Sequence, residues 1–378
     1  MSTEYVPAAE VRPETFTSRA ADHVQRGAQR GRELRTGIES AIAGYRRYFE
    51  FLSIAEVDVR AAAASSHARL QAWSPEAAEE VAAVAEGAKV PVDELMEVIA
   101  RTEIMTLAPA SATECSTVSF TRPGGSLAAQ NWDWAADFST LWHINDVGAV
   151  PGQLRHVGIA EYGMLGKIGL NEAGVGVLLN ILKHEGDGAG GVPIHMILER
   201  VLSTATTLDE ALEIIHSAPT TSSSIITVVT ADEVVQVEIA NVQKRERRAG
   251  GSSASPGSGS GFLLHTNHFL HPELVPGSLE LNATSTSRAR HAHLERRLED
   301  YSIRAGASGG PESTADLIDL LTTGPGEAPV SCTPAPGAAY GDRSATLVTV
   351  QVDPKRKQID LAPGSPADGM QGNRRYQL

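Results

Sequence analysis

The sequence contains few cysteines: Cys115 and Cys332 are the only two among 378 residues. So few thiols exclude a disulfide scaffold and favour a reducing compartment. The chain also lacks any window approaching the roughly 20 apolar residues of a membrane span. Its first residues lack the basic start and apolar core of a secretory signal. These absences predict a cytoplasmic protein without a membrane partner.

Positive charge is scarce as well. The 32 lysines and arginines face 46 aspartates and glutamates, which gives a formal net charge of −14. Such a surface repels phosphate backbones, so a nucleic-acid partner is disfavoured. The one basic run, residues 244–248, adjoins a Gly/Ser-rich tract over 249–261. We interpret the run as a solvated hairpin end and the tract as a flexible surface excursion.

Motifs for metals and nucleotides are missing too. The sequence contains no HExxH and no CxxC motif. His265 and His268 are too loosely placed for a metal site, and the run 166–169 is not followed by the Ser or Thr of a phosphate loop. We therefore predict no metal, no nucleotide loop and no cofactor.

Helical periodicity dominates the chain before Cys115. Residues 1–16 look irregular. Ser74 followed by proline predicts the start of a helix, and Gly87 predicts its end. Apolar residues at spacings of three or four predict helices over residues 18–51, 57–73, 75–87 and 92–107. This region is expected to form a helical layer.

From Cys115 onward, β-branched and alternating patterns predict strands. The expected strands lie at residues 115–120, 129–134, 168–180 (two strands around a turn), 224–230, 234–239, 262–269, 345–352 and 358–362. Helices are expected over residues 192–215 (a pair, the second with a capped start at Thr207), 285–301 and 313–321. Two blocks of strands with helices between and outside them predict an α+β fold, in which stacked sheets are covered by helical layers.

Cys115 is the best nucleophile candidate, since it starts a polar strand and is one of two thiols. A hairpin over 115–134 can place its thiol beside the carboxylate of Asp133. Thr117 lies two residues along the same strand, hence on the same face, and is expected to support the reaction geometry. Asn267, at the polar end of its strand, could donate its amide to a developing oxyanion, a contact typically worth about 2.7–4 kcal/mol.

Several short motifs stand out along the chain: Trp73-Ser74-Pro75-Glu76, Ala85-Glu86-Gly87, Arg101-Thr102-Glu103, Cys115-Ser116-Thr117, Gln130-Asn131-Trp132-Asp133-Trp134, the run 166–174, Val192-Pro193-Ile194, the strand of Glu238, His265-Thr266-Asn267-His268, Ser285-Thr286-Ser287-Arg288 and Thr346-Leu347. Together they resemble the acyl-coenzyme A:6-aminopenicillanic acid acyltransferase family, the C45 peptidases of the N-terminal nucleophile (Ntn) hydrolase superfamily. The resemblance covers residues 70–365.

The resemblance implies a four-layer αββα Ntn-hydrolase sandwich with an N-terminal helical propeptide layer. It also implies a precursor that cuts itself between Glu114 and Cys115, giving a helical chain 1–114 and a catalytic chain 115–378 that stay associated. The cleaved N-terminal chain is thus a predicted partner. The family commonly has glycine where this chain has Glu114, and glutamate is penalised in the strained backbone that self-cleavage exploits. Cutting would be slower, or the carboxylate would position the attacking water.

A free α-amine on Cys115 would suit the chemistry. The unperturbed pKa of an α-amine is roughly 7.7–8.0, and that of a thiol is about 8.5. The amine is therefore well suited to accept the proton of the thiol on the same residue. Asp133 would orient this amine and favour its charged form. Arg288 is predicted to shape the pocket and face an anionic or carbonyl part of the substrate, with Ser285 and Trp134 as further substrate contacts.

The predicted function is that of an autoproteolytic Ntn cysteine amidohydrolase or acyltransferase. It would act on amide or thioester bonds of small N-acyl compounds through an S-acyl enzyme. Nothing in the sequence specifies a coenzyme A site, which favours small-amide hydrolysis over acyl-CoA-dependent transfer of the penicillin acyltransferase type. Two alternatives stay open: an uncut cysteine hydrolase with a histidine base, and an uncleaved, non-catalytic binding protein of the same fold, which Glu114 favours. The substrate and a homo-oligomeric state are also left open.

Overall fold

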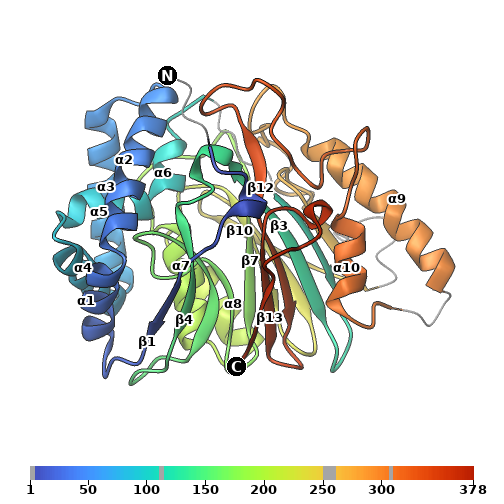
Figure 1. Ribbon diagram of the computed structural model, residues 1–378, viewed down its shortest axis with the longest axis horizontal. Coiled ribbons are helices and arrows are strands. Elements are labelled where there is room, and N and C mark those ends of the chain that lie inside the picture. The colour runs from blue at the N-terminus through green and yellow to red at the C-terminus, as the bar shows by residue number, and fades with distance from the viewer. Residues whose placement is uncertain (1–4, 110–114, 250–260, 306–309) are drawn as a thin grey trace.

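Two β-sheets stacked face to face form the centre of the computed structural model, which describes residues 5–109, 115–249, 261–305 and 310–378 (Figure 1). The strands are β1 (Thr15–Ser18), β2 (Cys115–Phe120), β3 (Leu127–Ala135), β4 (Trp142–Val147), β5 (His156–Glu161), β6 (Ile168–Asn171), β7 (Gly176–Ile181), β8 (Ser224–Val229), β9 (Val234–Ala240), β10 (Gln243–Arg248), β11 (Phe262–His265), β12 (Ser344–Asp353), β13 (Gln358–Pro363) and β14 (Arg374–Gln377). Within these ranges, one sheet has the order β1-β4-β5-β6-β7-β8-β9-β10 and the other β11-β2-β3-β12-β13-β14.

Helices cover both outer faces of the stacked sheets. They are α1 (His23–Glu33), α2 (Arg35–Phe51), α3 (Glu56–Trp73), α4 (Pro75–Ala88), α5 (Val92–Ile99), α6 (Arg101–Met105), α7 (Ile194–Thr204), α8 (Leu208–Ser217), α9 (Ser287–Ala305) and α10 (Thr314–Leu321). Helices α7 and α8 pack on β6, β7 and β8 of the larger sheet, whereas α9 and α10 pack on β11, β2 and β3 of the smaller one. The sheets meet between β2 and β7 and between β13 and β5. The predicted four-layer αββα sandwich is confirmed.

The N-terminal segment is built into the sandwich. Its helices lie on the opposite side of the molecule from α9 and α10 (Figure 1). Strand β1 pairs in parallel with β4 and so extends the larger sheet. Helix α1 packs closely on α4, where a Cβ added to Gly31 would meet the Val84 carbonyl oxygen at 2.1 Å. Beside that contact, Arg26 and Glu80 form a buried ion pair of 2.6 Å. The segment therefore shares both hydrogen bonds and core with the rest of the chain.

Local predictions differ from the structure in a few places. Strand β1 lies where an irregular segment followed by a helix was expected, because its pairing partner β4 is distant in sequence. The basic run 244–248 forms edge strand β10, in which Arg247 is buried rather than solvated. The helix expected over 92–107 divides into α5 and α6 at Ala100. Most of the Gly/Ser tract 249–261 lies outside the described residues. Among the described helices, none is long and apolar enough to span a membrane.

Candidate active site

Cys115 is the first residue of β2, which pairs with β3 on one side and β11 on the other. It lies directly opposite Trp132, so these two side chains share the face toward the larger sheet, and Asp133 projects from the other face. The thiol donates a long hydrogen bond of 3.9 Å to the main-chain carbonyl oxygen of Asp133. The hairpin thus brings the thiol beside the carbonyl of Asp133, whose carboxylate also acts on the thiol through its charge. Glu114 lies outside the described residues.

The Cys115 thiol is latent in the intact chain. Its residue is only 3% exposed. Burial, and after it the negative charge of Asp133, raise the pKa of the thiol to about 12, against the opposing charges of Lys167 and Arg290. A thiol with such a pKa is protonated at neutral pH and a poor nucleophile.

Side chains hold both main-chain groups of Cys115. Its N–H donates to Asn267 Oδ1 at 2.8 Å. Its carbonyl oxygen accepts from Arg290 Nη1 at 2.8 Å and from Asn180 Nδ2 at 3.1 Å. Asn267 in turn donates through Nδ2 to the carbonyl of Ile181 at 2.9 Å. Asn267 therefore adjoins Cys115, and its Nδ2, predicted to serve an oxyanion, donates one of its two hydrogens to Ile181 in the intact chain.

Arg290 is the cation of the site. It is fully buried on α9. Besides the Cys115 carbonyl, it donates to Ser116 Oγ and Asn267 Oδ1, each at 2.8 Å, and to Thr286 Oγ1 at 3.0 Å. One guanidinium thereby joins the nucleophile strand, the Asn267 loop and the start of α9.

The structure does not bring Arg288 to this site. Its side chain is 66% exposed and pairs with Glu280 at 2.7 Å. Two residues along a helix turn the side chain through about 200°, so Arg288 and Arg290 face opposite directions. Arg288 was predicted in place of Arg290 because a charged helix segment carries no local signal of which face is buried.

Thr117 lies behind Cys115 and is joined to it through Asn180. Thr117 Oγ1 donates to Asn180 Oδ1 at 2.7 Å and accepts from Gln130 Nε2 at 2.8 Å. Sequence reasoning missed Asn180 and Gln130. One signal could have found Asn180: it is an amide in the otherwise apolar strand β7.

The other three predicted site residues, Asp133, Trp134 and Ser285, each contact a different part of the fold. The Asp133 carboxylate accepts a hydrogen bond of 2.6 Å from Thr346 Oγ1 on β12. Trp134 is buried with Arg101 4.1 Å over its ring, so it lies in the core rather than on an open pocket wall. Ser285 is half-buried just before α9, where its Oγ accepts a long bond of 3.4 Å from Ser287 N.

The segment that carries Asn267 is fixed by buried polar groups. Ser287 Oγ accepts from Asn267 N at 2.8 Å. Glu238 accepts from Leu270 N at 3.1 Å and lies 3.0 Å from His265 Nε2, and its pKa is lowered by this histidine despite burial. Within the described residues, no cluster of three His, Cys, Asp or Glu side chains is arranged to hold a metal ion.

A narrow pocket adjoins the site at the end of β7. Its volume is about 20 Å³, which is room for roughly one water molecule. Ile181, whose carbonyl binds Asn267, contributes to the lining. The full lining is Thr102, Met105, Thr106, Ile181, Leu182, Lys183, Asp187, Ser222 and Ser223.

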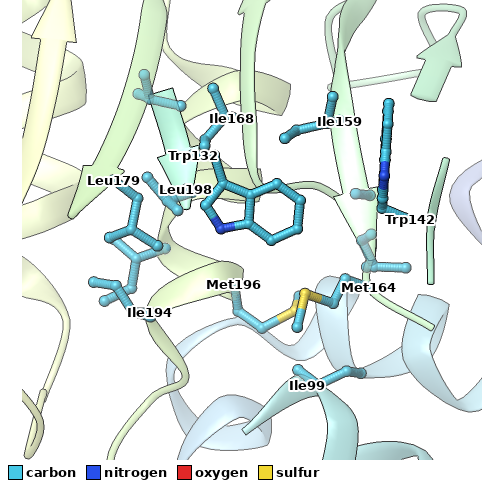
Figure 2. Close-up of a cluster of buried hydrophobic side chains, with 14 of the residues drawn as sticks. Ile99, Trp132, Trp142, Ile159, Met164, Ile168, Leu179, Ile194, Met196 and Leu198 are labelled. Atoms are coloured by element: carbon cyan, nitrogen blue, oxygen red, sulfur yellow. The ribbon is translucent and has the colours of Figure 1, made fainter. Parts of the chain in front are cut away.

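A buried charge cluster lies on the Trp132 side of Cys115. Trp132 itself is surrounded by apolar side chains that include Ile159, Ile168 and Met196 (Figure 2). Lys167 Nζ lies 3.5 Å from the centre of the Trp132 ring. It also donates to Glu161 Oε2 at 2.8 Å.

Comparison with known proteins gives a family. The model of the acyl-coenzyme A:6-aminopenicillanic acid acyl-transferase family matches residues 120–368. This span begins after Cys115 and includes Asp133, Asn267 and Arg290. The acyl-coenzyme A:6-aminopenicillanic-acid-acyltransferase 40 kDa form of Emericella nidulans is 30% identical over 234 residues, which is 61% of this chain and 62% of that protein. The chain thus matches less than two thirds of this relative's length.

Solved structures show a partial likeness. The penicillin V acylase from Agrobacterium tumefaciens is 16% identical, with a TM-score of 0.37, over 66% of this chain and 83% of that one. A mutant of the conjugated bile acid hydrolase from Clostridium perfringens is 12% identical, with a TM-score of 0.44, over 70% and 92%. Overlaps of this extent say nothing about the activity of this chain. Because the family model covers most of the chain, this protein belongs to the acyl-coenzyme A:6-aminopenicillanic acid acyl-transferase family.

Proposed function

We propose that the protein is an autoproteolytic N-terminal cysteine hydrolase or acyltransferase. The chain would cut itself between Glu114 and Cys115, and the freed Cys115 would attack an amide or thioester bond of a small N-acyl compound. The S-acyl enzyme would then pass its acyl group to water or to an amine. Family membership supports acyl chemistry of this kind.

The observation that carries the proposal is the state of Cys115 in the intact chain. The main chain on both sides of its Cα is held by Asn267, Asn180 and Arg290, while the thiol is buried with a pKa of about 12. A site built for an intact-chain nucleophile would instead lower the thiol pKa. Cleavage supplies a new base, the α-amine, on the residue that needs it.

The hydrogen-bond partners of the Cys115 main chain suit a free N-terminus at Cys115. Asn267 Oδ1, 2.8 Å from the Cys115 nitrogen, would accept a hydrogen from the freed α-amine. Asp133, on the adjoining strand, is proposed to favour the charged form of that amine. The oxyanion role of Asn267 would use the second Nδ2 hydrogen, or the one that the Ile181 carbonyl accepts in the intact chain.

Of the alternatives, the histidine-base hydrolase has the least support. Within the part of the chain that the structure describes, the thiol's hydrogen-bond partner is a carbonyl oxygen, and no histidine is among the groups that shift its pKa. Between hydrolysis and transfer, we propose hydrolysis of small amides. The pocket beside Ile181 holds about one water in the intact chain, so a bulky acyl-CoA would need more rearrangement than a small amide.

Intact-mass spectrometry tests the proposal. We expect two fragments meeting at Glu114/Cys115 in the wild type, a single chain in Cys115→Ala, and normal cutting in the matched control Cys332→Ala, whose thiol is also buried. Incubation with a panel of amides and thioesters should give an acyl adduct on the fragment that begins at Cys115. A chain that keeps residue 1, stays in one piece and still turns over substrate would refute self-activation. An inert single chain would favour the binding protein.

A further inference from the structure

Lys167 is a buried basic residue that contacts Trp132 of β3, the strand paired with β2. Its residue is 1% exposed, and its side chain is fixed by the 2.8 Å bond to Glu161 and by the Trp132 ring. Trp132 lies directly opposite Cys115 in the β2–β3 ladder. The ammonium and the thiol therefore lie on the same side of the smaller sheet, and the charge of Lys167 acts on the thiol.

Glu161 is shared between Lys167 and the N-terminal segment. Its Oε2 also accepts from Arg101 of α6, from Nη2 at 2.7 Å and from Nε at 3.1 Å. Its Oε1 accepts a hydrogen bond from the Tyr45 hydroxyl of α2. Arg101 and Lys167 thus both donate to the Glu161 carboxylate, and Arg101 is fully buried as well. Arg101 and Lys167 therefore compete for the one Glu161 carboxylate, and Glu103 also acts on Arg101.

The charge of Lys167 acts on Cys115. The groups that face Lys167 are Glu161 of β5, Arg101 of α6, His195 of α7 and Cys115 itself. Burial and the two cations keep the pKa of His195 well below its ordinary value, so it is neutral and does not add to the charge. A thiolate at Cys115 would be stabilised by the Lys167 ammonium, in surroundings where water screens little.

We propose that Lys167 is a positioning residue for Cys115, which stabilises the negative charge on its sulfur, and that Arg101 of the N-terminal segment limits this effect by repelling the Lys167 ammonium. The inference rests on the proposed function of Cys115 as the nucleophile. The N-terminal segment then has a second role, because its residue Arg101 sets how readily the Cys115 thiol ionises.

The direction of the Arg101 effect follows from the titration of Lys167. Burial lowers the pKa of Lys167 to about 7, Arg101 lowers it as well, and Glu161 and Cys115 oppose both. The ammonium is therefore complete below pH 7 and is lost as the pH rises through that value. Without Arg101, Lys167 would stay charged to higher pH and the thiolate would be favoured at pH 8.

The test measures alkylation of Cys115 by iodoacetamide between pH 6 and 9, followed by mass spectrometry in a Cys332→Ala background. We expect Lys167→Met to react about tenfold more slowly at pH 7, equivalent to a thiol pKa raised by about one. Lys167→Arg keeps the charge and should stay close to the starting rate at pH 7. Arg101→Gln should react faster at pH 8. The matched control Lys355→Met, in an exposed turn, should not change.

Opposite signs for Lys167→Met and Arg101→Gln are the decisive result, because a purely structural role would slow or speed both alike. Equal directions, or a Lys167→Met profile identical to that of Lys355→Met, would overturn the proposal. If Lys167→Met fails to fold, as judged by its melting transition, the comparison of Lys167→Arg with Arg101→Gln at pH 8 still decides it. Alkylation needs neither cleavage nor turnover, so loss of the proposed function in the mass and substrate assays is separately visible.

Discussion

Replacing Arg290 with methionine tests the architecture of the site most directly. Arg290 donates to the Cys115 carbonyl, Ser116 Oγ, Asn267 Oδ1 and Thr286 Oγ1 from a fully buried position. Methionine keeps an apolar stem but is shorter than arginine and removes every donor. The Cys115 carbonyl would keep its bond from Asn180 and Asn267 Oδ1 its bond from the Cys115 N–H, whereas Ser116 Oγ and Thr286 Oγ1 would lose the Arg290 donor at a cost of about 1–3 kcal/mol each. We expect a loss of about 3–5 kcal/mol in the free energy of unfolding, as for other broken buried charge networks.

Arg288→Met is the matched control on the same helix. Its ion pair with Glu280 is largely exposed, so we expect a change within about 0.5 kcal/mol. Stability would be measured by urea denaturation in a Cys115→Ala background, which keeps the chain in one piece. Self-cleavage of the variants with Cys115 intact would be followed by mass, and we expect it to slow only in Arg290→Met. A larger effect from Arg288→Met than from Arg290→Met, on either measurement, would refute the assignment.

Two further changes probe the N-terminal segment. Burial raises the pKa of Glu103 from 4.5 to about 7, so the folded chain holds a proton there that the unfolded chain has lost, and stability falls as pH rises through this window. Glu103→Gln stays neutral, so it should gain up to about 3 kcal/mol at pH 8 and little at pH 5 in urea denaturation; an equal change at both values would contradict this. Gly31→Ala would press a methyl onto the Val84 carbonyl and should cost about 1–3 kcal/mol. Gly44→Ala, which meets a movable Leu141 side chain at 3.0 Å, should cost less, and the reverse order of melting temperatures would be evidence against close α1–α4 packing.

Local patterns were sufficient for most of the elements. The β2–β3 hairpin, the turn between β6 and β7, and the capped start of α8 at Thr207 all lie where the sequence predicts them. Each of these depends on neighbours within a few residues: β-branched alternation, a glycine turn, or a threonine that accepts from the N–H three positions on. The helical layer before Cys115 and the covered sandwich followed from the same periodicities.

By itself, the sequence determined the layered fold, the family resemblance and the identity of Cys115, Asp133 and Asn267 as residues of interest. Only the tertiary structure decided that Arg290 rather than Arg288 reaches Cys115, that Asn180 holds its carbonyl, and that β1 joins a sheet formed by residues far along the chain. It alone brought Arg101 and Lys167 onto one carboxylate. The physical reason is that periodicity reports which residues are apolar, whereas a buried charge is identified by its partners, and these come from distant elements.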